Sequence, residues 1–154
     1  MPTISPVQSV DVQGAIARAA TRTGVDFDYL LAQARLESGL DPSAKARTSS
    51  ATGLYQFIDS TWLRTLDRHG AKHGMDWADA AIGSNGRVAD RATRDHLLSL
   101  RYDADTSSLM AAELTRENAA GLRTVLGREA EPAELYLAHF LGLGGAQKVL
   151  GALA

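Results

Sequence analysis

Apolar residues recur at helical spacing along most of this chain, and the pattern predicts a mostly α domain. Only the short stretch 52–58, with its aromatic and β-branched residues, favours extended backbone, so at most a very small β element is expected there. The expected helices cover residues 10–23, 26–37, 59–74, 77–82, 90–102, 106–126, 132–141 and 146–150.

The second expected helix ends on a carboxylate. Glu37 falls at the edge of the apolar arc that passes through Leu30 and Ala34, so its side chain is expected to point toward the core side. Burial disfavours the charged form of a carboxyl group, and a carboxyl group of this kind suits a general acid. Gly39 and Pro42 then end the helix, because glycine accepts a left-handed cap and proline cannot continue the hydrogen-bond ladder.

Two motifs lie close together around the loop after this helix. The first is Glu37-Ser38-Gly39-x-Asp41-Pro42-x-Ala44, and the second is Ala51-x-Gly53-Leu54-Tyr55-Gln56-Phe57. In this order they resemble the active-site signature of soluble lytic transglycosylase domains, which belong to the lysozyme-like superfamily. The resemblance implies a lysozyme-like helical domain that acts on the glycan strands of bacterial peptidoglycan.

The resemblance also implies roles for individual residues. Glu37 is expected to be the only catalytic acid/base, and Ser38 is expected to orient the reacting sugar. Gln56 is expected to line the glycan cleft, with Tyr55 and Phe57 beside it. The implied reaction cleaves the β-1,4 bond between N-acetylmuramic acid and N-acetylglucosamine and leaves a 1,6-anhydro sugar, with the substrate acetamido group assisting.

A later segment resembles the family's Ala-Tyr-Asn-Ala-Gly motif imperfectly. It runs Tyr136-Leu137-Ala138-His139-Phe140-Leu141-Gly142, and aligning Ala138 and Gly142 puts His139 where the family has tyrosine. The family's hydroxyl near the acid is therefore missing unless Tyr136 supplies it. Tyr136 and His139 are both candidate substrate-binding residues, and a core-edge histidine bonded to a backbone carbonyl is the alternative for His139.

Other conspicuous residues are interpreted as structural. His69 and His73 have the spacing of a two-histidine metal face, but no third ligand accompanies them, so a packed helix side is preferred and no metal or other cofactor is expected. Trp62 and Trp77 are expected to fill the core. We expect the solvent-exposed face of the helix near residues 90–102 to carry Arg87, Arg91, Arg94 and Arg101.

Composition narrows the remaining classes. The 154 residues fit one domain, expected over 10–154 behind a flexible arm at 1–9. A net charge of -2 offers no basic footprint for nucleic acid. No apolar run reaches the roughly 20 residues that span a bilayer, and no export signal can be read at the start. A monomer in the periplasm or at the cell wall is expected, its export route and any flagellar, secretion or phage machinery being open.

Two other functions stay open at this point. A lysozyme-type muramidase would hydrolyse the same bond with water. A non-catalytic peptidoglycan-binding or assembly module would keep the cleft without turnover, which the altered late motif makes conceivable. The presence of both Glu37 and Gln56 favours an enzyme.

Overall fold

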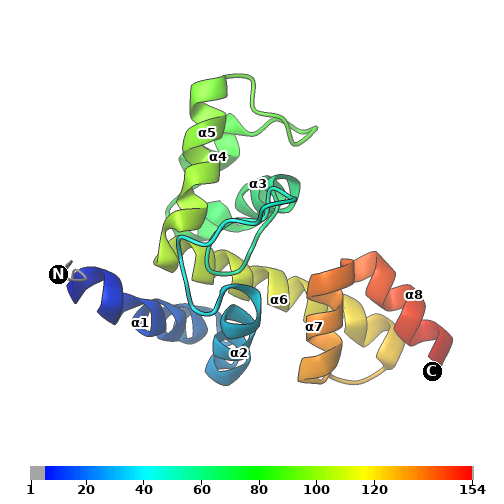
Figure 1. Cartoon of the computed structure of the whole chain (residues 1–154). Coiled ribbons are helices and arrows are strands. Elements are labelled where there is room, and N and C mark those ends of the chain that lie inside the picture. The colour runs from blue at the N-terminus through cyan, green and yellow to red at the C-terminus, as the bar shows by residue number, and fades with distance from the viewer. Residues whose placement is uncertain (1–5, 154) are drawn as a thin grey trace.

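The computed structural model describes residues 6–153, and this part of the chain is helical without a named strand (Figure 1), which confirms the mostly α class. Two isolated antiparallel bridges, Lys45 to Thr52 and Thr52 to Phe57, are its β structure. The helices are α1 (Pro6–Thr23), α2 (Phe27–Ser38), α3 (Asp59–His69), η1 (Gly70–His73), α4 (Asp76–Ala81), α5 (Arg91–Ser99), η2 (Leu100–Tyr102), α6 (Ala104–Leu126), α7 (Pro132–Leu141) and α8 (Leu143–Leu153), where η denotes a 3₁₀-helix.

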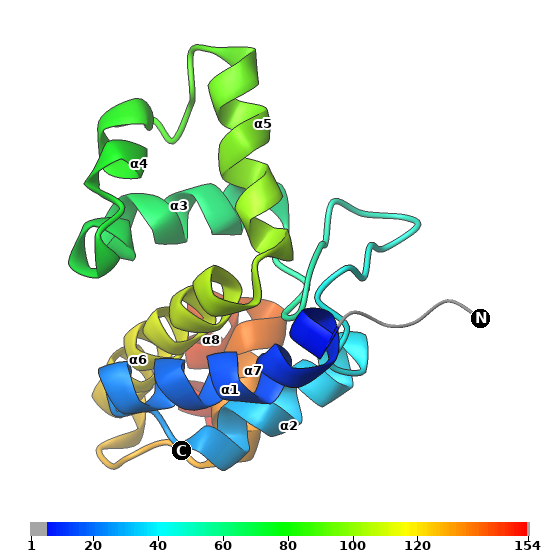
Figure 2. The same ribbon diagram turned by 90° about the vertical axis from the view of Figure 1, so that its left-hand side faces the viewer.

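The long helix α6 organises the other helices. It packs against α1, α2, α3, α7 and α8, whereas α4 and α5 pack against α3. Figures 1 and 2 show α3, α4 and α5 grouped above the remaining helices, with the loop between α2 and α3 joining the two groups. The candidate catalytic segment therefore lies where the two groups of helices meet.

Local capping explains the boundaries of several helices. The Asp26 side chain accepts a hydrogen bond from the Tyr29 amide at 3.0 Å and caps α2, and Gly39 ends that helix with a φ of 66°. Asp103 caps α6 in the same way, so this helix begins two residues earlier than expected. The first helix begins at Pro6 instead of at residue 10, and the rest of the expected arm, residues 1–5, lies outside the described residues.

The expected bounds of two other helices were wrong. The expected helix 59–74 is divided into α3 and η1 at Gly70. Ile58 takes the N-cap position of α3 without a side-chain bond, and Asp59, the first residue of the helix, pairs with an arginine. The last helix, α8, is longer than the expected 146–150 and is separated from α7 only by Gly142.

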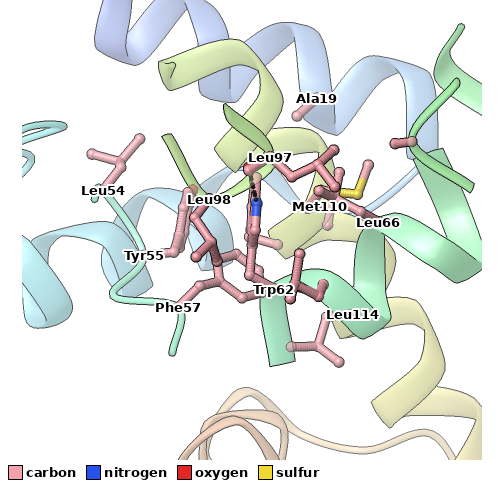
Figure 3. Close-up of a cluster of buried hydrophobic side chains, with 14 of the residues drawn as sticks. Ala19, Leu54, Tyr55, Phe57, Trp62, Leu66, Leu97, Leu98, Met110 and Leu114 are labelled. Carbon is pink, nitrogen blue, oxygen red and sulfur yellow. Dashed lines mark hydrogen bonds between the residues drawn. The ribbon is translucent and has the colours of Figure 1, made fainter. Parts of the chain in front are cut away.

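The main core joins the loop to the surrounding helices, as Figure 3 shows. Trp62 is fully buried, its indole Nε1 donates to the Leu97 carbonyl at 2.8 Å, and its ring meets Phe57 edge-on at 4.9 Å between centroids. The expectation for Trp62 is confirmed. The expectation for Trp77 was wrong, because this side chain is 45% exposed and stacks on His96. A smaller core joins α6, α7 and α8 through Leu122, Ala138 and Ala146.

Arg101 holds the second half of the loop. Its guanidinium donates to the carbonyls of Ser50 at 2.8 Å and Phe57 at 2.9 Å and pairs with Asp59 at 2.8 Å. Only 7% of Arg101 is exposed, so the expectation of a solvated face was wrong for this residue. Its own carbonyl lies so close to Gly53 that an added Cβ would sit 2.2 Å away. Glycine is therefore required where the loop crosses Arg101.

His69 and His73 contact two glutamates of α6 that are also four residues apart. His73 Nε2 lies 2.7 Å from Glu113 Oε2, and His69 Nε2 is hydrogen-bonded to Glu117. Lys72 lies 3.5 Å from the same buried Glu113 carboxylate. The two histidines thus form a polar contact that fastens α3 and η1 to α6, in line with the packed helix side expected from the sequence.

Replacing Arg101 by methionine should lower the free energy of unfolding by about 3 kcal/mol, because two loop carbonyls and the Asp59 carboxylate lose a charged donor. Urea denaturation measures this change. The matched control is Arg91→Met at an exposed position of α5, expected within about 0.5 kcal/mol of the parent. Equal stabilities of the two variants would contradict the role of Arg101 in holding the loop.

Protonation of Glu113 should destabilise the fold. Burial acts to raise the pKa of Glu113, but the hydrogen bond from His73 and the charges of Lys72, Arg116 and His69 lower it below its ordinary value of 4.5. A depressed folded-state pKa stabilises the protein above the unfolded value, and this contribution is lost as the pH falls through the folded value.

Urea denaturation across the acidic range measures this loss. Glu113→Gln should show a weaker acid dependence and a lower stability near neutral pH than the parent. Glu129→Gln, at an exposed surface pair, is the control and should keep the parent's acid dependence. The same acid dependence in Glu113→Gln and the parent would show that protonation of Glu113 does not cause the loss of stability.

Candidate active site

The Glu37 side chain, in the last turn of α2, opens on a cleft of about 670 Å³. Side chains of α3 and α6 form two of its sides, and the end of α7 with the start of α8 forms a third. The lining residues are Glu37, Gln56, Phe57, Ile58, Thr61, Arg64, Arg68, Leu114, Glu117, Asn118, Ala138, His139, Phe140, Leu141, Gly142, Leu143 and Gly144.

Tyr136 engages the Glu37 carboxylate from the opposite end of the sequence. Its hydroxyl donates to Glu37 Oε1 at 3.0 Å. Burial and this hydrogen bond to Glu37 raise the pKa of Tyr136, so the phenol keeps the proton that it donates. Between the two candidates of the late motif, Tyr136 is therefore the one that brings a hydroxyl to the acid.

His139 lies one turn beyond Tyr136 on α7 and lines the cleft. Burial lowers the pKa of His139, although the Glu37 carboxylate and the nearby Tyr55 backbone act in the opposite direction. A neutral imidazole is thus favoured at this place. The backbone contact fits the core-edge alternative, and the position in the cleft leaves substrate contact as a prediction.

Tyr29, which neither motif includes, lies near enough to Glu37 and Tyr136 to be influenced by their charges, although it does not line the cleft. Burial and the neighbouring Tyr136 and Glu37 raise the pKa of Tyr29, which keeps its phenol protonated as well. It lies in the first turn of α2, well outside both motifs. In the sequence, only its place on the same helix as Glu37 could have indicated that Tyr29 lies near the candidate acid.

A tight turn at residues 53–56 positions Gln56. The backbone of Gln56 has a φ of 54°, and its side-chain amide donates to the carbonyls of Gly53 at 2.9 Å and Ala44 at 3.2 Å. The amide NH₂ therefore supports the loop itself. Because Gln56 also lines the cleft, its amide carbonyl is the group suited to contact a ligand.

The same turn sends Tyr55 the other way. Tyr55 is fully buried, and its hydroxyl donates to the Leu30 carbonyl of α2 at 2.9 Å. The expectation that Tyr55 lies beside the substrate was therefore wrong, since a motif gives the order of residues but not the direction in which a turn points each one. Phe57, only 2% exposed, belongs to the core with one edge on the cleft.

Ser38 joins the end of α2 to this turn. Its hydroxyl donates to the Leu54 carbonyl at 2.7 Å and accepts from the Asp41 amide at 3.1 Å. Ser38 is not one of the residues that line the cleft. In this structure it holds Glu37 against the loop, and a contact with the sugar stays a prediction.

The cleft contains further polar residues that the motifs did not include. Glu117 and Asn118 come from α6, and Arg64 and Arg68 come from α3. Glu117 is engaged by His69 and by Arg68, whose Nη1 lies 3.4 Å away. No local sequence signal marked these residues, because the packing of α3 over α6 creates the wall they share.

Comparison with known families agrees with this geometry. Residues 14–80 match the family model described as the Transglycosylase SLT domain, which confirms the resemblance to lytic transglycosylases. The matched segment includes Glu37, the loop and all of α3, whereas Tyr136 and His139 lie beyond it.

The mostly helical fold is consistent with a lysozyme-like domain, and residues 14–80 are similar to the lytic transglycosylase domain, a family that acts on peptidoglycan at the cell wall. Within residues 6–153, no helix is both long and apolar enough to cross a membrane.

Tyr136→Phe should lower kcat about 10- to 100-fold, because a hydrogen bond to a carboxylate contributes about 1.5–3 kcal/mol. The free energy of unfolding should change by less than about 1 kcal/mol, since only one half-buried hydroxyl is removed. Turnover of purified peptidoglycan and urea denaturation measure the two effects. Tyr102→Phe, at an exposed position of η2, is the control. Parent-like turnover of Tyr136→Phe would contradict the role of this hydroxyl.

Proposed function

We propose that this protein is a peptidoglycan lytic transglycosylase. It cleaves the β-1,4 bond between N-acetylmuramic acid and N-acetylglucosamine and leaves the muramoyl residue as a 1,6-anhydro sugar. The observation that supports this proposal most directly is the Glu37 carboxyl group, which faces a cleft of about 670 Å³ and has a phenol donor on one of its two oxygens.

In the first step, protonated Glu37 gives its proton to the glycosidic oxygen, and the bond from that oxygen to C1 of the muramoyl residue breaks. The acetamido carbonyl oxygen of the same sugar bonds to C1 and stabilises the oxocarbenium-like centre. Tyr136 donates a hydrogen bond to Oε1 of the carboxylate that forms and so occupies that oxygen. The proton is therefore transferred from Oε2.

In the second step, the Glu37 carboxylate takes the proton of the muramoyl C6 hydroxyl. O6 then bonds to C1, the bond to the acetamido oxygen breaks, and Glu37 is protonated again. No water enters the product. The attacking hydroxyl belongs to the reacting sugar, so its effective concentration is high without a second protein group.

The charges of the cleft support a mechanism with one carboxyl group. Among its described lining residues, Glu117 is the other carboxylate, and both His69 and Arg68 contact it. A hydrolase of the usual kind needs a second carboxylate that acts as base or nucleophile. A Glu117 side chain occupied by two cationic or hydrogen-bonding partners is poorly suited to this task.

The proposed place of action is the bacterial periplasm or cell wall, where the substrate is found. Peptidoglycan glycan strands are the proposed partner, and the protein is proposed to act as a monomer. An association with a flagellar or secretion apparatus would require partners that no described contact identifies, so it forms no part of the mechanism.

Digestion of purified peptidoglycan followed by mass analysis tests this function. The parent should release muropeptides that are one water lighter than lysozyme products and lack a reducing end. Glu37→Gln should keep the fold and lose at least about 100-fold in rate, because a general acid contributes about 10²–10⁴-fold. Predominantly reducing-end products would identify a muramidase, and binding without any soluble product would identify a non-catalytic module.

A further inference from the structure

One face of α3 presents a row of polar side chains to the cleft. Thr61, Arg64 and Arg68 are three and four residues apart, so they share a helix face, and all three line the cavity that contains Glu37. The catalytic steps described above use none of them. This row, called the α3 wall below, therefore needs another explanation.

The two arginines of the α3 wall differ in their surroundings. Arg68 is paired with Glu117 at 3.4 Å. Arg64 has no ion pair with any described residue, and its side chain is exposed at the cleft. Arg64 thus brings an uncompensated positive charge to a cleft whose other carboxylate, besides Glu37, is already engaged.

Asn118 provides a second polar group in the same cavity. It lies on α6, is only 4% exposed and lines the cleft. No described residue forms a hydrogen bond with its side-chain amide, and this amide is not among the sealed polar groups that lack a partner, so it is accessible from the cleft. A polar ligand in the cleft would satisfy this amide, which offers two donors and one acceptor.

A neutral sugar chain does not account for the Arg64 charge. N-acetylglucosamine carries no ionisable group, whereas N-acetylmuramic acid carries a lactyl carboxyl group, which is either free or linked to a peptide that has carboxylates of its own. Arginine is suited to these groups because its planar guanidinium matches a carboxylate with two parallel hydrogen bonds.

We propose that Arg64 on the α3 wall, with Asn118 in the same cleft, binds a carboxylate borne by the muramoyl substituent of the glycan strand. The protein thereby distinguishes muramic acid-containing strands from neutral polymers of N-acetylglucosamine. This inference rests on the proposed function and adds a determinant of substrate choice to it. Arg64 acts in binding and takes no part in the proton transfers of Glu37.

Binding measurements on the full chain test this inference. Glu37→Gln serves as the background, so that strands bind without turnover, and isothermal titration gives the Kd for three soluble probes. They are peptide-bearing glycan strands, strands stripped of peptide by an amidase, and a neutral N-acetylglucosamine oligomer. Arg64→Gln removes the charge, Arg64→Lys keeps it, and Arg91→Gln on α5 outside the cleft is the matched control.

Arg64→Gln should weaken binding of at least one anionic strand about 5- to 20-fold, the modest size expected for an exposed charged contact. Binding of the neutral oligomer should stay within about twofold of the background, Arg64→Lys should recover part of the loss, and Arg91→Gln should change nothing. A loss confined to peptide-bearing strands identifies a peptide carboxylate, and a loss confined to stripped strands identifies the lactyl carboxylate.

Unchanged affinity of Arg64→Gln for both anionic strands would overturn the inference. So would an equal loss on the neutral oligomer, or an absence of binding to all three probes. The proposed function is judged separately by the anhydro products of the parent protein. An active parent with an Arg64-independent Kd would therefore reject this inference and leave the lytic transglycosylase reaction in place.

Discussion

The shape of the candidate catalytic segment, the loop between α2 and α3, depends on the buried guanidinium of Arg101. The segment between α2 and α3 has little regular secondary structure, so its backbone carbonyls need partners from elsewhere. Arg101 binds the carbonyls of Ser50 and Phe57 and also pairs with Asp59 at the start of α3. A single charged side chain thus fixes where the loop ends and where the wall of the cleft begins.

The other end of the loop is fixed against α2. Ser38 binds the Leu54 carbonyl, and the buried Tyr55 hydroxyl binds the Leu30 carbonyl. These two bonds hold the last turn of α2 against the tight turn that carries Gln56. Hydrogen-bonded neighbours therefore place Glu37 in the cleft without a bound substrate, and such preorganisation is what an acid catalyst requires. The α7 helix then completes the site by bringing Tyr136 to the carboxylate.

Local sequence signals predicted the helices well because capping and spacing act within a few residues. In the structure Asp26 caps α2, Gly39 ends that helix as expected, and Pro132 lies in the first turn of α7. The positions of Glu37 and Gln56 in the cleft also agree with the motifs.

The failures concern the direction of side chains that long-range packing decides. Tyr55 is in the core because the tight turn at residues 53–56 points its side chain away from the cleft. Arg101 is buried because it lies in the 3₁₀ turn η2, where helical spacing no longer describes which way a residue faces. The choice between Tyr136 and His139 depended on how α7 packs and could not be made from the sequence. The α3 wall could not be predicted from the sequence either, because the packing of α3 on α6 decides which of its residues line the cleft.

The central claim is that one carboxyl group performs both proton transfers and that the substrate's own hydroxyl replaces water. Digestion of peptidoglycan in ¹⁸O-labelled water tests this claim most directly, because any hydrolytic product must acquire an oxygen from the solvent at C1. The proposed mechanism predicts soluble anhydro muropeptides without ¹⁸O at the cleaved sugar. One ¹⁸O atom in each released muropeptide would contradict the claim.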